Sequence, residues 1–293
     1  MKFVVIVAAV LMLLTSSDVN AQREMTPSND SLIAWYHQHY PFSTMDDSIF
    51  TFSSEFNLPD GFAPLDSSSL SPFQNWVADF PLWHRWKAVG NFKKQKSFEP
   101  DSICRPVHLP YRGPRQSDRN IPIRILAEWL ALSERWYDLV FLPHDGDTLT
   151  YDNFLRGRLL MDRRSRPYFE PSEERLHDLR EFYSYMSVLM DHSSYHGLTR
   201  NCRELAVDSL LPGDLIIASN ANGHKGQVWV MMHVIENSDG ERRYCVATGC
   251  EQACDFYIPL LSGDRDQPWI STERLEGLGT QWERRGYYRL NLP

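Results

Sequence analysis

The chain has 293 residues, of which 42% are hydrophobic, and its formal net charge at neutral pH is −8. That length can bury one large core, and the acidic balance argues against a nucleic-acid partner. Nothing in the composition departs from that of an ordinary globular protein, so function has to be sought in particular residues.

Residues 1–21 have the pattern of a cleavable secretory signal peptide. Lys2 precedes an apolar stretch from Phe3 to Leu14, and a small-residue cleavage site ends at Ala21. The apolar stretch is too short for a retained transmembrane helix, and no cysteine stands at the end of the leader. We therefore expect a periplasmic or secreted protein without a membrane span, starting near Gln22. The leader carries one charge of each sign, so its removal leaves the net charge at −8.

The first part of the remaining chain is polar. Residues 22–57 are rich in Ser, Asp, Asn and Thr, which predicts an irregular N-terminal segment, and a single domain is expected over residues 58–293. From Phe73 onward apolar residues recur at helical spacing until Pro81, which predicts a short helix. Residues 91–119 combine basic side chains with prolines and glycines, which is typical of a solvated loop and leaves open a contact with an anion.

Two longer helices are predicted in the middle of the chain. The first runs from Ile121 to Tyr137, with a proline in its first turn, and the second from Ser172 to Met190, with Ser172 as N-cap. A short strand from Asp138 to Leu142 lies between them. The turn after it carries Asp145 and Asp147, which resembles part of a calcium loop, but two carboxylates without further ligands indicate a plain turn.

After the second helix, the hydrophobic period changes from helical to alternating. The predicted strands are Asp214–Ala218, Gln227–Ile235, Tyr244–Ala247 and Phe256–Leu260, with a hairpin turn at Asn237–Gly240. Helices followed by a meander of antiparallel strands predict the α+β class.

Cysteine usage points to disulfides. The five cysteines are Cys104, Cys202, Cys245, Cys250 and Cys254. In an oxidising compartment this odd count suggests two bridges and one free thiol, and the last three lie close enough for a local bridge. Zinc held with His224 and His233 is the alternative, but the spacing matches no established metal motif. We predict disulfides, no metal and no cofactor.

One stretch carries a resemblance to an enzyme fold. Pro212-Gly213-Asp214 opens one predicted strand, and Gly226-Gln227-Val228 opens the next. This pair resembles NlpC/P60-type and other papain-like cysteine hydrolases, in which a Gly-His-Val strand carries the catalytic base. That chemistry needs a thiolate at a helix N-terminus and an imidazole beside it. Position 227 is Gln, which cannot accept a proton near neutral pH.

A wider resemblance covers the chain from about Leu58 to the C-terminus. Its best segments are Leu58-Pro59-Asp60-Gly61-Phe62, Arg124 to Leu130, Pro212-Gly213-Asp214, the Gly226 strand and Gln267-Pro268-Trp269. They resemble an exported family called domain of unknown function 4846, which implies a Cys at the start of the long helix and a His opening the later strand.

The positions that this family pattern would use for catalysis hold other residues here. Asp118 stands at the Cys position and Gln227 at the His position. His233 replaces an acidic residue at the end of the strand, and Thr248 replaces a Gln after the next strand. A carboxylate and a neutral amide cannot perform thiol acyl transfer, so the resemblance implies a degenerate, non-catalytic papain-like domain with a binding or structural role in the cell envelope.

An active cysteine hydrolase is the main alternative. Asn201-Cys202 resembles the start of the helix that carries the nucleophilic Cys in NlpC/P60 proteins. His224 or His233 would then be the base. Too few residues separate Cys202 from Pro212 for a nucleophile helix, so a half-cystine or free thiol is favoured. His224 lies in a small polar loop, where a solvated ring is expected, and strand alternation would place a buried His233 on the side of Gln227.

A glycan-binding module is the third hypothesis. Aromatic residues make up 13% of the chain, and sugar faces stack on exposed rings. Most of the tryptophans fall on predicted apolar faces, where core packing explains them. Trp269 is the best candidate for a pocket wall. Peptidoglycan or another glycan is thus the expected partner in both binding hypotheses.

Overall fold

The computed structural model describes residues 50–91, 93, 95–109 and 115–292. The predicted signal peptide and most of the predicted irregular segment lie outside these residues. The end of that segment forms the short helix α3, Phe52–Glu55. Among the described residues no helix is both long enough and apolar enough to cross a bilayer.

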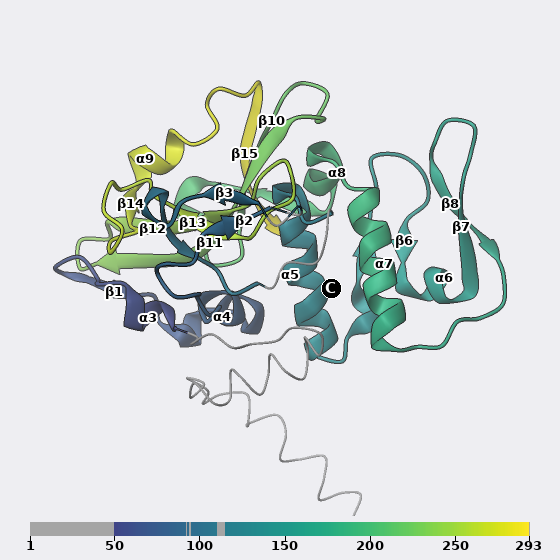
Figure 1. Ribbon diagram of the computed structural model, residues 1–293, viewed down its shortest axis with the longest axis horizontal. Helices are drawn as coiled ribbons and strands as arrows, with labels where there is room; N and C mark the ends of the chain where they lie inside the picture. The colour runs from purple at the N-terminus through teal and green to yellow at the C-terminus, as the bar shows by residue number, and fades with distance from the viewer. Residues whose placement is uncertain (1–49, 92, 94, 110–114, 293) are drawn as a thin grey trace, which may run out of the picture. The chain divides into compact units, whose positions relative to one another are not determined.

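An antiparallel sheet forms the centre of the described chain (Figure 1). Its strands run in the order β4-β13-β12-β11-β10-β15-β9, with β1 added beside β11 and β14 beside β12. Their bounds are β1 Phe62–Pro64, β4 Ile103–Pro106, β9 Cys202–Leu205, β10 Leu215–Ser219, β11 Gly226–Asn237, β12 Arg242–Thr248, β13 Tyr257–Pro259, β14 Ile270–Ser271 and β15 Arg284–Leu290. The predicted meander and its hairpin turn are confirmed, and the fold is α+β.

Helices and three small ribbons complete the fold. The remaining helices are α4 Pro72–Ala78, α5 Ile121–Leu132, α6 Tyr151–Arg156, α7 Leu179–Asp191, α8 Tyr195–Arg200 and α9 Thr272–Glu276. The ribbons pair β2 Val89–Gly90 with β3 Lys96–Phe98, β5 Val140–Phe141 with β6 Leu149–Thr150, and β7 Gly157–Met161 with β8 Pro167–Pro171. The β7–β8 hairpin lies beyond α6 and α7 from the main sheet, and the sequence did not predict it (Figure 1).

The two faces of the sheet bury separate hydrophobic clusters, as strand alternation requires. Val228 and Val230 of β11 belong to the larger cluster, which also contains the apolar faces of α5 and α7. Trp229 and Met231 belong to the smaller one, together with Leu275 of α9. The helices α5 and α7 therefore cover one face of the sheet, and the C-terminal part of the chain covers the other.

Two predicted helices have different ends in the structure. The first ends at Leu132, because Ser133 caps it and Glu134 adopts a left-handed backbone with φ 55°. The second begins at Leu179 with Asp178 as its N-cap, so Ser172 is not the cap. The backbone N–H of Arg175 instead donates to the Leu155 carbonyl of α6 at 2.8 Å, which keeps the preceding segment out of the helix.

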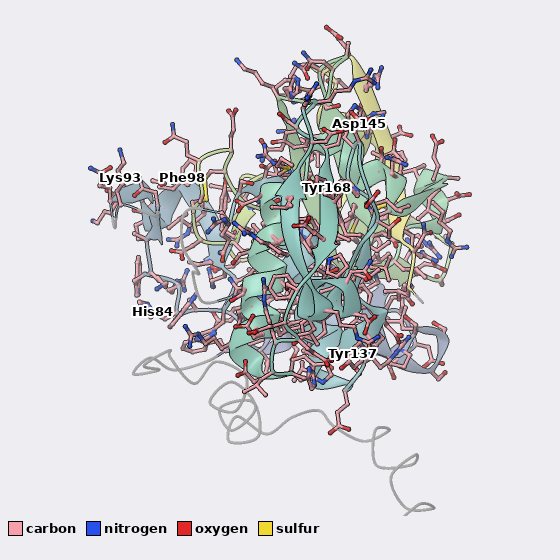
Figure 2. All side chains as sticks on the ribbon, turned by 90° about the vertical axis from the view of Figure 1, so that its right-hand side faces the viewer. His84, Lys93, Phe98, Tyr137, Asp145 and Tyr168 are labelled. Atoms are coloured by element: carbon pink, nitrogen blue, oxygen red, sulfur yellow. A yellow bond between two sulfur atoms is a disulfide. The ribbon has the colours of Figure 1, made fainter. Side chains whose placement is uncertain are left out.

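The face formed by α6, α7 and the small ribbons carries exposed aromatic side chains. Figure 2 looks onto this face and shows Tyr137 and Tyr168 on it. Tyr137 is 53% exposed, and Leu176 in the loop before α7 is 80% exposed. Scattered apolar side chains of this kind are normal on protein surfaces.

Candidate functional site

The start of α5 holds the residue at the position of the expected nucleophile. Asp118 opens a single 3₁₀ turn, Asp118–Asn120, that leads directly into the helix. Its backbone N–H donates to the Cys250 carbonyl at 3.0 Å, beyond the end of β12. Gly249 permits this approach, because a Cβ there would lie 2.6 Å from Ile121 Cδ1 and 3.2 Å from Asp118 Cα. The helix start is thereby anchored against the ends of β11 and β12.

The Asp118 carboxylate is sealed inside the protein. The residue is 1% exposed, and its oxygens accept hydrogen bonds from the Tyr195 hydroxyl at 2.9 Å and the Val228 backbone N–H at 2.9 Å. Burial raises the pKa of Asp118 to about 6, although these hydrogen bonds to the ionised form oppose the shift. Burial and the adjacent carboxylate likewise raise the pKa of Tyr195. The group is thus a buried hydrogen-bond acceptor between α5, α8 and β11.

Gln227, at the position of the expected base, makes a different set of contacts. Its Nε2 donates to Thr248 Oγ1 at 2.8 Å and to the Gly249 carbonyl at 3.2 Å. Thr248 Oγ1 in turn donates to the Val228 carbonyl at 2.6 Å. Gln227 pairs in register with Ala218, which places its side chain on the face of the sheet opposite to α5.

Asp118 and Gln227 therefore lie near the same end of β11, but their side chains do not interact with each other. Asp118 bonds to the backbone N–H of Val228, the residue next to Gln227, but the two side chains are directed to different partners. An amide and an alcohol take up no proton at neutral pH, and none of the three groups supplies a thiolate. The arrangement bears hydrogen bonds that position α5 and contains no thiol–imidazole pair.

Cys202 does not begin a helix, contrary to the alternative prediction. It is the first residue of the edge strand β9 and directly follows the end of α8. Its thiol donates to the Leu198 carbonyl at 3.2 Å, and burial raises its pKa to about 12. A reactive cysteine needs a depressed pKa and a positive surrounding, so this environment is the reverse of activation.

The two candidate histidines lie in separate places. His224 is exposed in the loop between β10 and β11, as predicted, and its backbone N–H donates to Asn220 Oδ1 at 3.0 Å. The expectation that His233 shares a side with Gln227 is wrong, because a β-bulge between Met231 and His233 shifts the alternation. His233 instead pairs with Cys245, and its ring lies 3.7 Å from that of Phe52. Burial lowers its pKa to about 3, so it remains neutral.

One of the predicted local disulfides is present. Cys250 and Cys254 are bonded, whereas Cys104, Cys202 and Cys245 are free thiols. The bridge closes the loop whose Cys250 carbonyl receives the N–H of Asp118. The second predicted bridge is absent among these cysteines. No group of three His, Cys, Asp or Glu within the described ranges could hold a metal ion.

Two further candidates turn out to be ordinary structural elements. Trp269 is 7% exposed, and its indole Nε1 donates to the Asn57 carbonyl at 2.8 Å, so it is a core residue and does not form a pocket wall. Asp145 and Asp147 are exposed in the turn before β6, where Asp145 lies 3.6 Å from His144 Nε2 (Figure 2). No third acidic ligand joins them within the described residues.

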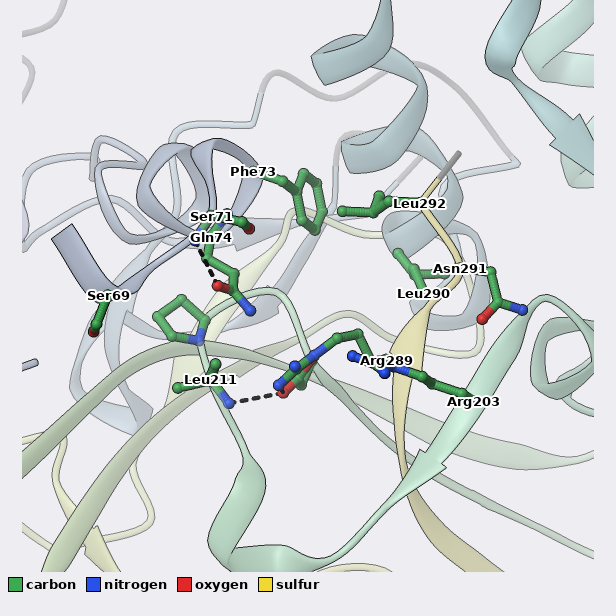
Figure 3. Close-up of a pocket in the computed structure, with 12 residues that line it drawn as sticks. Ser69, Ser71, Phe73, Gln74, Arg203, Leu211, Arg289, Leu290, Asn291 and Leu292 are labelled. Atoms are coloured by element: carbon green, nitrogen blue, oxygen red, sulfur yellow. Dashed lines mark hydrogen bonds and ion pairs between the residues drawn. The ribbon is translucent and has the colours of Figure 1, made fainter. Parts of the chain in front are cut away.

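A pocket of about 540 Å³ lies beside Pro212 and Asp214, which precede the first residue of β10 (Figure 3). The end of β10 that pairs with Gln227 is the opposite end of the strand. Gly213 has φ +86°, and a Cβ there would lie 2.7 Å from Phe73 Cε1, so the turn requires glycine. Asp214 is 1% exposed and forms a paired contact with Arg289, at 2.7 Å from Nε and 2.6 Å from the terminal nitrogen. Strands β9 and β15 and the start of α4 supply the other walls.

Sequence reasoning missed this pocket and three polar pairs, which are Asp118–Tyr195, Asp214–Arg289 and Arg124–Glu128. Tyr195 and Arg289 are distant in sequence from Asp118 and Asp214, so no local pattern links them. The Arg124–Glu128 ion pair, at 2.8 Å and buried within α5, has the i,i+4 spacing that could have indicated it. Its members had been expected only as part of a helical segment.

Comparison with known proteins gives one match. Neither the curated proteins nor the solved structures contain one that matches this chain. The family model described as "Domain of unknown function (4846)" matches residues 52–284, which is more than three quarters of the 293-residue chain, and the match ends at the first residue of β15. The chain therefore belongs to the family of domain of unknown function 4846.

Proposed function

We propose that this protein is an exported, non-catalytic domain of papain-like descent that has a binding or structural role in the cell envelope. The observation that carries the proposal is the buried Asp118 carboxylate at the start of α5. The resemblance implies a nucleophile at this position, and here the side chain is 1% exposed and accepts hydrogen bonds from Tyr195 and Val228. A group in that state stabilises the junction of helix and sheet and has no access to a substrate.

The surroundings of Asp118 support the same conclusion. The turn that leads into α5 meets the first residues of β11 and the end of β12, and this contact of helix and sheet supports the proposed papain-like descent. Gln227 and Thr248, which stand near this junction, hydrogen-bond to each other at 2.8 Å. The architecture of a catalytic centre would thus persist while each chemical group has been replaced by one that only holds structure.

The alternative of an active cysteine hydrolase has less support. Cys202 lies on an edge strand, and burial raises its pKa to about 12. The exposed His224 lies in the loop before β11, and the half-buried His233 lies within β11. A thiol needs an imidazole within hydrogen-bond reach to be activated as in papain-like enzymes. The hydrogen bond of the Cys202 thiol goes to a backbone carbonyl instead.

A hydrolase assay tests the absence of catalysis. The purified protein is incubated with peptidoglycan fragments, and the release of new amino groups is followed by chromatography beside an active amidase. We expect no turnover. Turnover that is abolished by Asp118→Ala, Gln227→Ala or Cys202→Ala would refute the proposal, whereas Arg158→Met, a change on the exposed strand β7, controls for trace contaminants.

Export and the binding role need separate measurements. The full chain is expressed in a bacterial host, and the N-terminus of the protein recovered from the periplasm or medium is sequenced. We expect it to begin near Gln22, and retention in the cytoplasm with Met1 intact would contradict export. Sedimentation with isolated peptidoglycan then distinguishes the two roles, because a binding domain moves to the pellet and a purely structural one stays in solution.

A further inference from the structure

Two arginines face each other directly across the strands that line the pocket. In the antiparallel pair β9–β15, Arg203 and Arg289 are register partners. Directly opposed side chains on one sheet face lie about 5 Å apart at Cβ, and like charges there are destabilising. A negative charge near the two guanidinium groups would offset their repulsion. The pocket that both arginines line has room for a group that carries such a charge.

One carboxylate of the protein meets part of this need. Asp214 engages Arg289 through both of its oxygens, at 2.7 and 2.6 Å, and Arg289 also donates to the Ser209 carbonyl at 3.0 Å. Arg289 is thereby committed to the protein. Arg203 is exposed and forms no salt bridge in the part of the chain that the structure describes. Burial raises the pKa of Asp214, and the charges of Arg289 and Arg203 both oppose that rise, so the two arginines share one carboxylate. The lining thus holds two cations and one anion, in a protein whose net charge is −8.

The rest of the lining suits a small amphipathic molecule. Phe73 and Leu290 are core residues that reach one side of the pocket with 4% and 5% of their surface exposed, and the half-buried Leu292 adds the rest of its apolar lining. In Figure 3 the Phe73 ring lies beside the Leu292 side chain. Arg203 lies on the other side of Leu290 in this view. The Gln74 amide oxygen accepts the backbone N–H of Ser71 at 2.8 Å within the helix cap, which leaves the amide nitrogen as a donor.

We propose that this pocket binds a small carboxylate carried on an apolar body, with the carboxylate on the Arg203 guanidinium and the apolar body against Phe73 and Leu292. Guanidinium groups match carboxylates in geometry, and a pocket of about 540 Å³ has the size of a site for a small ligand. The site is distinct from the Asp118 region and does not depend on the absence of catalysis there. A fatty acid and the C-terminal end of an apolar peptide share the required chemistry.

Titration calorimetry with matched ligands tests the proposal. Octanoate and N-acetyl-Leu-Ala are each compared with their neutral amides, on the purified full chain. We expect at least one acid to bind, and its amide to bind about tenfold more weakly or worse, because a charged hydrogen bond is lost. Binding of octanoate alone identifies a fatty-acid site, and binding of the peptide acid alone identifies a peptide-end site.

Variants at exposed positions connect the binding to Arg203. Arg203→Met should weaken binding of the acid about tenfold and leave the weak binding of the amide unchanged. Arg158→Met, the matched loss of one exposed strand arginine outside the pocket, should leave both unchanged. The proposal is overturned if neither acid binds at millimolar concentration, if acid and amide bind equally, or if Arg203→Met binds the acid as the original protein does.

Discussion

At pH 8 the Asp118→Asn variant should have a larger free energy of unfolding than the original protein. Its free energy of unfolding should also depend less on pH. Burial raises the pKa of Asp118 from 3.8 to about 6. Because the folded state binds this proton more tightly than the unfolded state, stability is greatest below about pH 4 and falls as the pH rises towards 6. Asparagine is isosteric, always neutral, and can still accept a hydrogen bond from the Val228 N–H.

The magnitude follows from the two pKa values. A difference of about 2 units corresponds to roughly 3 kcal/mol of unfolding free energy, since each unit is worth about 1.4 kcal/mol. About half of that develops between pH 5 and pH 8, because the proton is already partly released by the unfolded chain at pH 5. Asp118→Ala should differ, since it leaves the buried Tyr195 hydroxyl and Val228 N–H unpaired at roughly 1–3 kcal/mol each.

Urea unfolding followed by tryptophan fluorescence at pH 5 and pH 8 measures these effects. Between the two pH values the original protein should lose about 1.5 kcal/mol relative to Asp118→Asn. Other carboxylates, such as Asp79 with a pKa that burial raises to about 6, are common to both proteins and cancel in the difference. Asp239→Asn in the exposed hairpin turn should behave as the original protein does. If Asp118→Asn shows the same pH dependence as the original protein, the reasoning about the buried carboxylate is wrong.

Three other predictions concern stability and thiol chemistry. Gly213→Ala should lower the unfolding free energy by about 2–3 kcal/mol in urea titrations, because the new Cβ adds a clash with Phe73 to the strain of a positive φ. Gly240 has a similar positive φ but open space around it, so Gly240→Ala should lower the unfolding free energy by about 1 kcal/mol. Cys202 should resist iodoacetamide at pH 7.5 in the folded protein and react in urea, as peptide mapping would show; rapid labelling without urea would restore it as a nucleophile. Reduction of the Cys250–Cys254 bridge should cost about 2 kcal/mol, and an unchanged melting temperature in reductant would contradict a stabilising role.

Local patterns predicted the elements whose residues interact with near neighbours. The capping box of α4, in which Ser71 and Gln74 bond reciprocally, produces a helix with nearly the predicted bounds. The strands β10 to β13 appear with their turn, since short apolar runs bounded by turn residues indicate strands that are buried on both faces. Ser172 is a plausible cap that tertiary contacts override, and the bulge before His233 leaves no trace in the alternation.

The sequence alone determined that positions 118 and 227 carry neither a thiol nor an imidazole, because they are Asp and Gln. Whether Cys202 could meet His224 or His233 was decided only by the tertiary structure. The state of the groups that are present was decided by tertiary structure. Asp118 is buried, which raises its pKa, and it accepts hydrogen bonds from Tyr195 and Val228, which are far from it in sequence and oppose that rise. The opposition of Arg203 and Arg289 likewise arises from the register of two strands. Burial and pairing set pKa values and charge balance, and both depend on contacts between residues that are distant in the chain.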